Sequence, residues 1–298
     1  MRGARTPKEA LFAQLSLEEK ERSGAEARRL YRIEEEARLA ADRLIALHRQ
    51  GKEQSLSQFS DFLPREEDAA DFHMALFRHL EAAGLCIDAA DLLPKEKQAV
   101  PGERIAYLKN RFTEQAYEMF APRLSSPTVS YCAAFAESAR TVGEGGADLC
   151  ILPWRDADGV ALHTFFRLVE QYDLSIRALC RVPDDGDGFM EYVLAGEGIA
   201  IPQKEDLYLA LILPSRKEHG FEKLLSYCRK IGARAVYTEG YPDRHTGGTV
   251  WRVTLDLARK TLPFFLLYLF LYDTDAEIFG IMEAPPTLSS DMKEEEKS

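Results

Sequence analysis

The spacing of apolar residues predicts two helices in the first third of the chain. Between residues 16 and 50 apolar side chains recur at steps of three and four within a charged sequence: Leu30, Ile33, Ala37, Ala40, Leu44 and Leu47. This spacing is typical of a helix with one narrow apolar seam, which needs a partner helix. A second helix is expected after Pro64, and Gly84 is placed to end it. Its apolar side consists of Ala69, Phe72, Leu76 and Leu80.

From residue 104 the apolar pattern changes to short strands that alternate with helices. Strands are expected at 104–108, 128–131, 149–152 and 174–182, and helices at 113–120, 134–143 and 160–172. This alternation implies a parallel sheet covered by helices on both faces. The turn-rich segment 183–188 ends this region.

Beyond the break, the expected order is strand, helix, strand, strand, helix, strand. The strands are 207–213, 233–238, 250–257 and 276–282, and the helices are 221–231 and 262–272. That order builds an antiparallel sheet with two helices on one face, and residues 243–248 supply a turn for its middle hairpin.

The expected fold class is therefore α/β combined with α+β. A helical region at 1–100 precedes a parallel-sheet lobe of the periplasmic-binding type at 101–200 and a ferredoxin-like βαββαβ domain at 201–286. Residues 287–298, which are acidic and rich in lysine, are expected to form a disordered tail.

Charge and cysteine content narrow the classes of partner. A net charge of −11 repels phosphate, so neither nucleic acid nor an anionic membrane is an expected partner, and small molecules or proteins are. The five cysteines form no C-x-x-C pair, which favours reduced thiols in the cytoplasm, without disulfide, metal or other cofactor. The apolar run 262–272 is shorter than the roughly 20 residues of a membrane span.

Two segments of the lobe and the end of the chain resemble a known enzyme family. Residues 105–116 and 146–159, followed by Leu174-Ser-Ile176, resemble the first lobe of prephenate dehydratases. The last strand, the helix before it and the hairpin that precedes this helix are similar to the ACT domain that follows the catalytic part in that family. This segment ends in Ile278-Phe-Gly-Ile281. The resemblance implies an enzyme that decarboxylates and dehydrates prephenate to phenylpyruvate.

The positions that match the family's catalytic residues carry altered side chains. Thr113 keeps a hydroxyl after the first strand, while Arg155 and Asp156 stand where the family has Glu-Asn in its Pro-x-Glu-Asn stretch. Met190 stands where the family has its catalytic threonine, and a thioether is no proton donor. The family's second lobe is reduced to residues 183–188. The resemblance therefore implies an impaired carbon–oxygen lyase, or pseudoenzyme, with a regulatory role in phenylalanine biosynthesis.

The ACT resemblance implies an amino-acid site and a homodimer. Gly220 and Phe221 match the family's Gly-Ala-Leu loop, and Glu239, Gly240 and Tyr241 match its Glu-Ser-Arg-Pro stretch. An aromatic amino acid or a prephenate-like dicarboxylate is the expected ligand, held by backbone groups at a helix start.

Two alternatives remain open. Residues 1–100 occupy the place of the AroQ-type chorismate mutase domain of many such enzymes, so the chain is alternatively an active dehydratase or a bifunctional mutase and dehydratase. However, Arg32, Arg43, Arg49 and Lys52 do not match the mutase spacing. The other alternative is a non-enzymatic assembly protein that uses the seam from Leu30 to Leu47.

Overall fold

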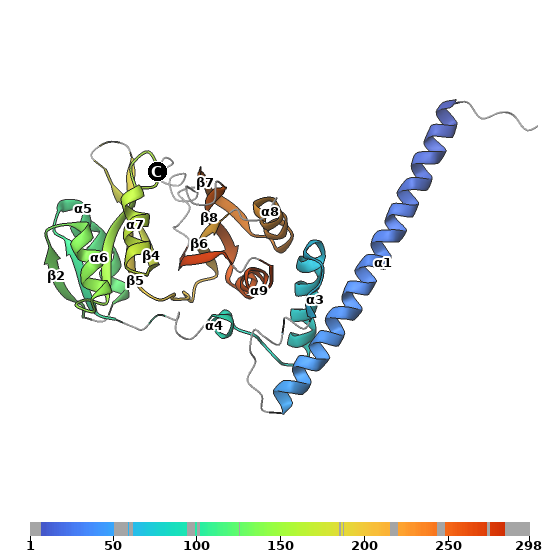
Figure 1. Ribbon diagram of the computed structural model, residues 1–298, viewed down its shortest axis with the longest axis horizontal. Helices are drawn as coiled ribbons and strands as arrows, with labels where there is room; N and C mark the ends of the chain where they lie inside the picture. The colour runs from blue at the N-terminus through green and yellow to red at the C-terminus, as the bar shows by residue number, and fades with distance from the viewer. Residues whose placement is uncertain are drawn as a thin grey trace, which may run out of the picture. The chain divides into compact units, whose positions relative to one another are not determined.

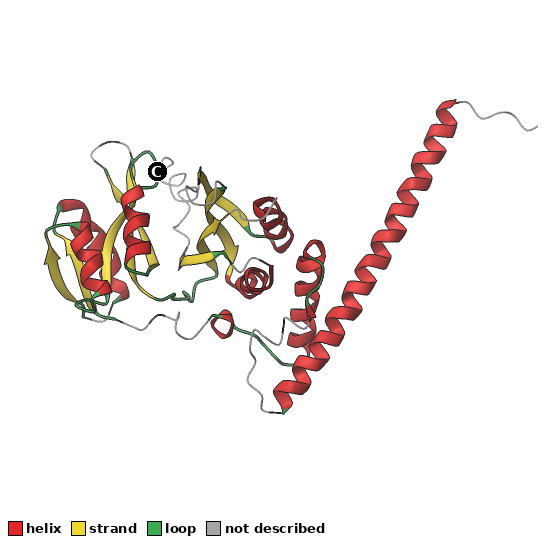
Figure 2. Ribbon diagram, in the orientation of Figure 1, coloured by secondary structure: helices red, strands yellow, loops and turns green. Residues whose placement is uncertain are grey.

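The structure is a computed structural model of the chain. It describes residues 7–50, 59, 62–93, 99, 102–124, 126–184, 186, 188–214, 220–242, 248–272 and 275–283, with side chains from residue 21 on. The contacts divide the chain into two compact units, residues 1–87 and residues 88–298. Figures 1 and 2 show the elements of each unit.

The first unit is a pair of helices. The long helix α1 (Pro7–Arg49) packs against α3 (Ala69–Ala82), which follows the 3-10 turn η2 (Glu66–Asp68). The predicted seam is buried at Ile33, Ala37, Ala40 and Leu44, whereas Leu30 is 45% exposed. Gly84 follows α3 with a positive φ of 76°, which a glycine adopts without strain, so the predicted helix end is confirmed.

The second unit contains a mixed sheet of nine strands in the order β2-β1-β3-β5-β4-β9-β6-β8-β7. Its first half consists of β1 (Arg104–Leu108), β2 (Thr128–Cys132), β3 (Leu149–Arg155), β4 (Leu174–Pro183) and β5 (Phe189–Glu197). The parallel pairing expected here is confirmed for β1 with β2 and β3, but β5 inserts between β3 and β4 and runs antiparallel to both. The sheet is mixed because β5 returns directly from β4.

Helices cover both faces of this half (Figure 1). One face carries α5 (Arg111–Phe120), and the 3-10 turn η4 (Ala121–Arg123) follows it. The other face carries α6 (Phe135–Gly143) and α7 (His163–Gln171). Alternate residues of β5 serve the two faces, because successive side chains of a strand point to opposite sides. Tyr192 and Leu194 lie on the α5 side, and Val193 and Ala195 on the α7 side.

The second half has the predicted strand and helix order. It contains β6 (Asp206–Pro214), α8 (Gly220–Ile231), β7 (Arg234–Pro242), β8 (Thr249–Ala258), η5 (Arg259–Thr261), α9 (Leu262–Tyr272) and β9 (Glu277–Glu283). All its strand pairs are antiparallel, in the order β9-β6-β8-β7, as in ferredoxin-like sheets. A short helix, α4 (Ala89–Leu92), precedes β1 and contacts α9. Residues 243–247 of the predicted turn at 243–248, and the predicted tail at 287–298, lie outside the described residues.

The two halves of the sheet meet at β4 and β9. These strands pair in parallel at Ile176 and Gly280, where a Cβ on the glycine would lie 2.5 Å from Cβ of Ile176. Only glycine permits this approach. A shared core lies on the α7 side, since side chains of α7, β3, β6 and β9 belong to one buried cluster. The helices α8 and α9 cover the opposite face of the second half.

The division of this unit at residue 200 stays a prediction, as does the boundary at residue 100. Among the described residues, no helix combines the length and apolar character that crossing a membrane requires.

Candidate functional site

Arg155, the last residue of β3, lies beside a buried carboxylate. Its Nη1 donates to Oε2 of Glu191 at 3.0 Å, and Nε of Arg181 on β4 donates to Oε1 of Glu191 at 3.1 Å. The three side chains come from neighbouring strands, because β5 pairs Glu191 opposite both arginines. A bulge between Pro153 and Arg155 shifts the register of β3 at this point. A carboxylate only 7% exposed is thus flanked by two cations.

A second arginine pair lies on the second half of the sheet. Arg252 on β8 is directly opposite Glu239 on β7, and its Nη1 donates to Oε2 of that glutamate at 3.3 Å. Tyr237 donates its hydroxyl to the same carboxylate oxygen at 3.2 Å. Arg252 is 6% exposed, so the guanidinium group has left bulk water.

Aromatic rings join these two groups into one cluster. The guanidinium carbon of Arg155 lies 4.2 Å from the ring centre of Tyr237 and 4.1 Å from that of Trp154. The guanidinium carbon of Arg252 lies 3.5 Å from the ring centre of Phe166 on α7 and 4.2 Å from that of Tyr241. We call this set the arginine cluster; it consists of Arg155, Arg181, Glu191, Tyr237, Glu239, Tyr241 and Arg252. It contains three guanidinium groups and two carboxylates, and therefore one net positive charge.

The cluster presents hydrogen-bond donors that lack acceptors. Within the described residues, Nε and Nη2 of Arg155 and Nε of Arg252 are buried and have no hydrogen-bond partner. The Nε and Nη2 edge of a guanidinium is one that can hold a carboxylate with two parallel hydrogen bonds. Stacking on rings occupies the faces of both guanidinium groups and leaves such edges for an anion.

Burial also keeps the two phenols of the cluster protonated. Burial raises the pKa of Tyr237, and the carboxylate of Glu239 raises it further. Burial likewise raises the pKa of Tyr241, although Arg252 opposes the shift. Both side chains are therefore neutral at pH 7 and act as hydrogen-bond donors and ring surfaces, not as bases.

The side chains at the other predicted catalytic positions make contacts outside the arginine cluster. Thr113 is buried in the first turn of α5, where its hydroxyl donates to the carbonyl of Leu108 and accepts from the N–H of Asn110. Asp156 closes a turn, since its Oδ1 accepts from the N–H groups of Asp158 and Val160 at 3.1 and 2.9 Å. Met190 packs on the α5 side of the sheet, opposite Glu191.

The predicted effector residues divide between the two faces of the second half. Glu239 and Tyr241 belong to the arginine cluster. Phe221, at the start of α8, stacks instead on Trp251 with ring centres 4.3 Å apart. A Cβ on Gly240 would lie 2.8 Å from the Trp251 ring, so this position requires glycine. Gly220 is the first residue of α8. An indole ring therefore occupies the space beside Phe221 and Gly240.

Sequence reasoning did not single out Glu191, Tyr237 and Arg252. A usable signal was present for two of them, because Glu191 and Arg252 each stand between two apolar neighbours within a strand. A charged residue in such a strand needs a partner when it is buried. The pairing of Glu239 with Arg252 depends on the register of β7 and β8, which sequence does not give.

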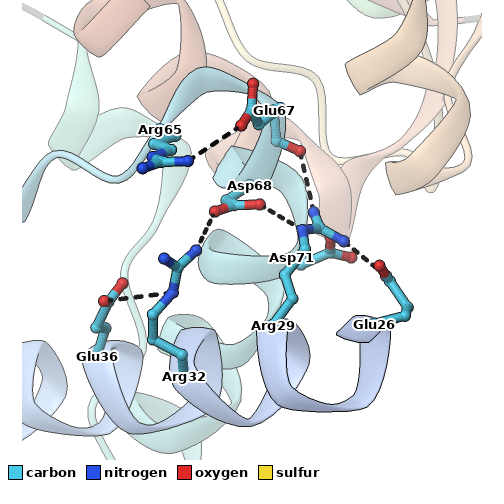
Figure 3. A network of polar contacts seen from close by, with 8 residues as sticks. All are labelled: Glu26, Arg29, Arg32, Glu36, Arg65, Glu67, Asp68 and Asp71. Carbon is cyan, nitrogen blue, oxygen red and sulfur yellow. Dashed lines mark hydrogen bonds and ion pairs between the residues drawn. The ribbon is translucent and has the colours of Figure 1, made fainter. Parts of the chain in front are cut away.

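In the helical unit, Arg29 and Arg32 are already bound by carboxylates (Figure 3). Asp68 is 3% exposed, and its two oxygens accept from Nε of Arg29 at 2.6 Å and from Nη2 of Arg32 at 2.8 Å. Arg29 also pairs with Glu26 at 2.6 Å and with Asp71 at 3.0 Å. This network ties α1 to η2 and α3, and the carboxylates already surround Arg29 and Arg32. No set of three or more metal-ligating side chains is found among the described residues.

Comparisons with known proteins give similar solved structures but no family. Neither a scan against protein-family models nor a search of curated proteins found a match. A prephenate dehydratase from Streptococcus mutans is 19% identical over 60% of this chain and 97% of its own, with a TM-score of 0.48. A prephenate dehydratase in complex with L-Phe from Arthrobacter aurescens is 12% identical over 61% of this chain and 90% of its own, with a TM-score of 0.49.

A third similar structure is described with a different activity. It is a protein described as a novel type of quorum quenching acylase, 15% identical over 63% of this chain and 99% of its own, with a TM-score of 0.48. These likenesses concern the fold.

Proposed function

We propose that the arginine cluster binds the carboxylate of a small aromatic acid, and that the protein is a regulatory relative of prephenate dehydratases without their catalysis. One observation carries the proposal: Arg155 presents its Nε and Nη2 edge, buried and without an acceptor among the described residues. A buried donor left unpaired costs about 1–3 kcal/mol, and a bound carboxylate removes that cost.

The rings of the cluster favour an aromatic ligand. Phe166, Trp154, Tyr237 and Tyr241 surround the two guanidinium groups. An aromatic ring gains roughly 0.5–1.5 kcal/mol from edge or offset contacts with such neighbours beyond the area it buries. Arg252 supplies a second cationic position, which suits either the second carboxylate of a prephenate-like acid or the single carboxylate of an aromatic amino acid.

We propose that the protein lacks dehydratase activity because of the side chains at the positions that match the family's catalytic residues. A general acid must reach the departing hydroxyl, and its proton must be available. The hydroxyl of Thr113 donates to the backbone carbonyl of Leu108, and Met190 supplies only a partly buried thioether that packs against the core.

We propose a cytoplasmic homodimer for the same protein. β7 is the outermost described strand of its half of the sheet, and Val236 on it is 39% exposed. An outer strand with free backbone groups can pair with a second copy. A monomeric mass in light scattering would contradict the dimer.

The binding proposal is tested by calorimetry on the full chain. Phenylalanine, phenylpyruvate and prephenate are compared with phenylethylamine, which has the ring but no carboxylate. We expect heat from at least one acid and none from the amine. Arg155→Gln should weaken the binding about tenfold to a hundredfold, because a charge-assisted hydrogen-bond pair is lost. The matched variant Arg234→Gln, which removes an exposed ion pair between β7 and β8, should leave the binding unchanged.

Catalysis is tested separately, by measuring phenylpyruvate formed from prephenate. Turnover in the range usual for dehydratases would refute the non-catalytic part of the proposal and favour the alternative of an active enzyme. The mutase alternative is tested in the same way with chorismate. Lack of heat with every acid would instead remove the binding part.

A further inference from the structure

A cavity of about 350 Å³ lies at the opposite end of β3 from the arginine cluster. Leu149, the first residue of β3, lines the cavity, whereas Arg155, the last residue, belongs to the cluster. Six residues at 3.3 Å each separate these positions by roughly 20 Å. The cavity is therefore a separate site, and its volume is within the range of small-ligand pockets.

The cavity has an aliphatic floor. Leu124, Leu149, Ala178, Leu194, Ile201 and Pro202 line it, and no aromatic residue is among the described lining residues. This composition differs from the ring-rich arginine cluster. It suits a short aliphatic group, which gains about 0.8 kcal/mol for each CH₂ it buries.

Two cations and two anions border this floor. The lining includes Arg123, Arg177, Glu103 and Glu283, so its formal charge is zero. Nη2 of Arg123, on η4, pairs with Oε2 of Glu283, on β9, at 3.1 Å. Both side chains of this pair are partly exposed, at 45% and 28%, so a ligand can exchange with either partner.

The fold holds Arg177 at the cavity. A register shift between Ile176 and Ala178 leaves Arg177 as the extra residue of a bulge in β4, a feature that re-aims a side chain. Nη2 of Arg177 donates to the carbonyl of Glu197. Gly196 leaves room for the Arg177 side chain, because a Cβ on Gly196 would lie 3.2 Å from Nε of Arg177. Burial lowers the pKa of Arg177, but a guanidinium stays charged at neutral pH.

From this arrangement we infer that the cavity is a second ligand site, for an α-amino acid with a short aliphatic side chain. The carboxylate lies against Arg177 and Arg123, the ammonium group against Glu103 and Glu283, and the side chain on the aliphatic floor. A zwitterion matches the zero charge of the lining, whereas a simple acid or amine brings a net charge into it. Because Glu283 and the segment 200–202 belong to or lead into the second half of the sheet, the ligand contacts both halves.

The inference is tested on the full chain with leucine, valine and two analogues of leucine. One analogue, 4-methyl-2-oxopentanoate, lacks the ammonium group, and the other, 3-methylbutylamine, lacks the carboxylate. We expect saturable binding of leucine or valine in calorimetry and at least tenfold weaker binding of both analogues. Equal binding of an analogue, or no binding of either amino acid at millimolar concentration, would overturn the inference.

Variants locate the site. Arg177→Gln should weaken leucine binding roughly ten- to hundredfold. Because Arg177 is partly buried, a second variant at the exposed rim, Glu283→Gln, guards against misfolding and should weaken binding several-fold. Arg234→Gln serves as the matched control. Unchanged leucine binding in both Arg177→Gln and Glu283→Gln would overturn the inference. Arg155→Gln, which lies in the other site, should not change leucine binding, so failure of the aromatic-acid proposal and failure of this one are distinguishable.

Discussion

The helical unit and the sheet unit both bury arginine–carboxylate contacts, but the balance of charges is opposite. In the helical unit, carboxylates outnumber cations around Arg29, and Asp68 uses both oxygens to bind Arg29 and Arg32. In the arginine cluster, guanidinium groups outnumber carboxylates, and an edge of Arg155 lacks an acceptor among the described residues. A satisfied network holds elements together, whereas a network with unpaired donors can also bind a ligand.

The environments of the arginines differ as well. Arg32 is 48% exposed and Arg29 27%, so water completes their solvation. The side chains of Arg155 and Arg252 are 12% and 7% exposed and lie on aromatic rings. Cation–π contact compensates part of the desolvation of a guanidinium without using its N–H groups. That is why the sheet unit, and not the helical unit, is the expected binding site.

The largest effect is expected when Asp68 is removed. Asp68→Ala removes the buried acceptor of two charge-assisted hydrogen bonds from Arg29 and Arg32. Each such bond contributes about 1.5–3 kcal/mol, so the free energy of unfolding should fall by about 3–5 kcal/mol. Urea unfolding followed by hydrogen exchange of residues 69–82 measures the loss. Asp42→Ala is the control, since its pair with Arg38 is at the surface. Equal losses of stability in the two variants would show that the burial of Asp68 does not increase the contribution of its ion pairs.

Glu191→Gln should separate stability from binding. The change leaves Arg155 and Arg181 without a carboxylate, so the free energy of unfolding should fall by about 2–3 kcal/mol. The same change adds one positive charge to the arginine cluster, so the affinity for an aromatic acid should rise. Urea unfolding and calorimetry give the two quantities, with Glu277→Gln at the exposed start of β9 as the control. A parallel fall of stability and affinity would mean that Glu191 organises the binding edge.

Burial of a histidine in the helical unit should make that unit sensitive to pH. Burial lowers the pKa of His73 from 6.5 to about 3. The unfolded state therefore binds a proton below pH 6.5 that the folded state refuses, so stability is complete above that pH and falls as the pH is lowered toward 3. Between pH 7 and pH 5 the loss should be about 2 kcal/mol. Hydrogen exchange at the two pH values measures it, and His73→Leu should flatten the dependence.

The smallest effect is expected for an exposed pair in the sheet unit. Arg234 and Asp256 lie 2.7 Å apart, but Arg234 is 73% exposed. Surface pairs contribute about 0–1 kcal/mol, so Arg234→Gln should change the urea midpoint little. A larger loss would contradict the view that burial, rather than the number of ion pairs, separates the two units.

Sequence predicted the elements well because their signals are local. The apolar seam of α1, the end of α3 at Gly84 and the strand and helix order after residue 207 follow from spacing and turn residues within one segment. The insertion of β5 between β3 and β4 does not, because it depends on pairing partners distant in sequence. The alternation of strands and helices from residue 104 to 182 therefore predicts a parallel sheet, whereas the observed sheet is mixed.

The candidate site was predicted only in part, for a related reason. Arg155, Glu239 and Tyr241 were singled out as positions that match family motifs, but no motif placed them together. The bulge before Arg155, the register of Glu239 with Arg252 and the packing of α7 on the second half of the sheet bring them into one cluster. Each of these is a tertiary feature. Gly240 was assigned to a ligand site, although a ring of the same sheet lies against it.

The direct return from β4 to β5 has a kinetic consequence. A protein with two lobes joined by crossing strands binds by closing one lobe on the other, and such closure adds a slow step on the microsecond to millisecond scale. Here β4 ends at Pro183 and β5 begins at Phe189, and the N–H of Asp184 donates to the carbonyl of Gly188 across the connection. Because β4 and β5 pair antiparallel from Leu174 to Pro183, they move as one layer. Association should therefore occur in one step, with an observed rate that rises linearly with ligand concentration.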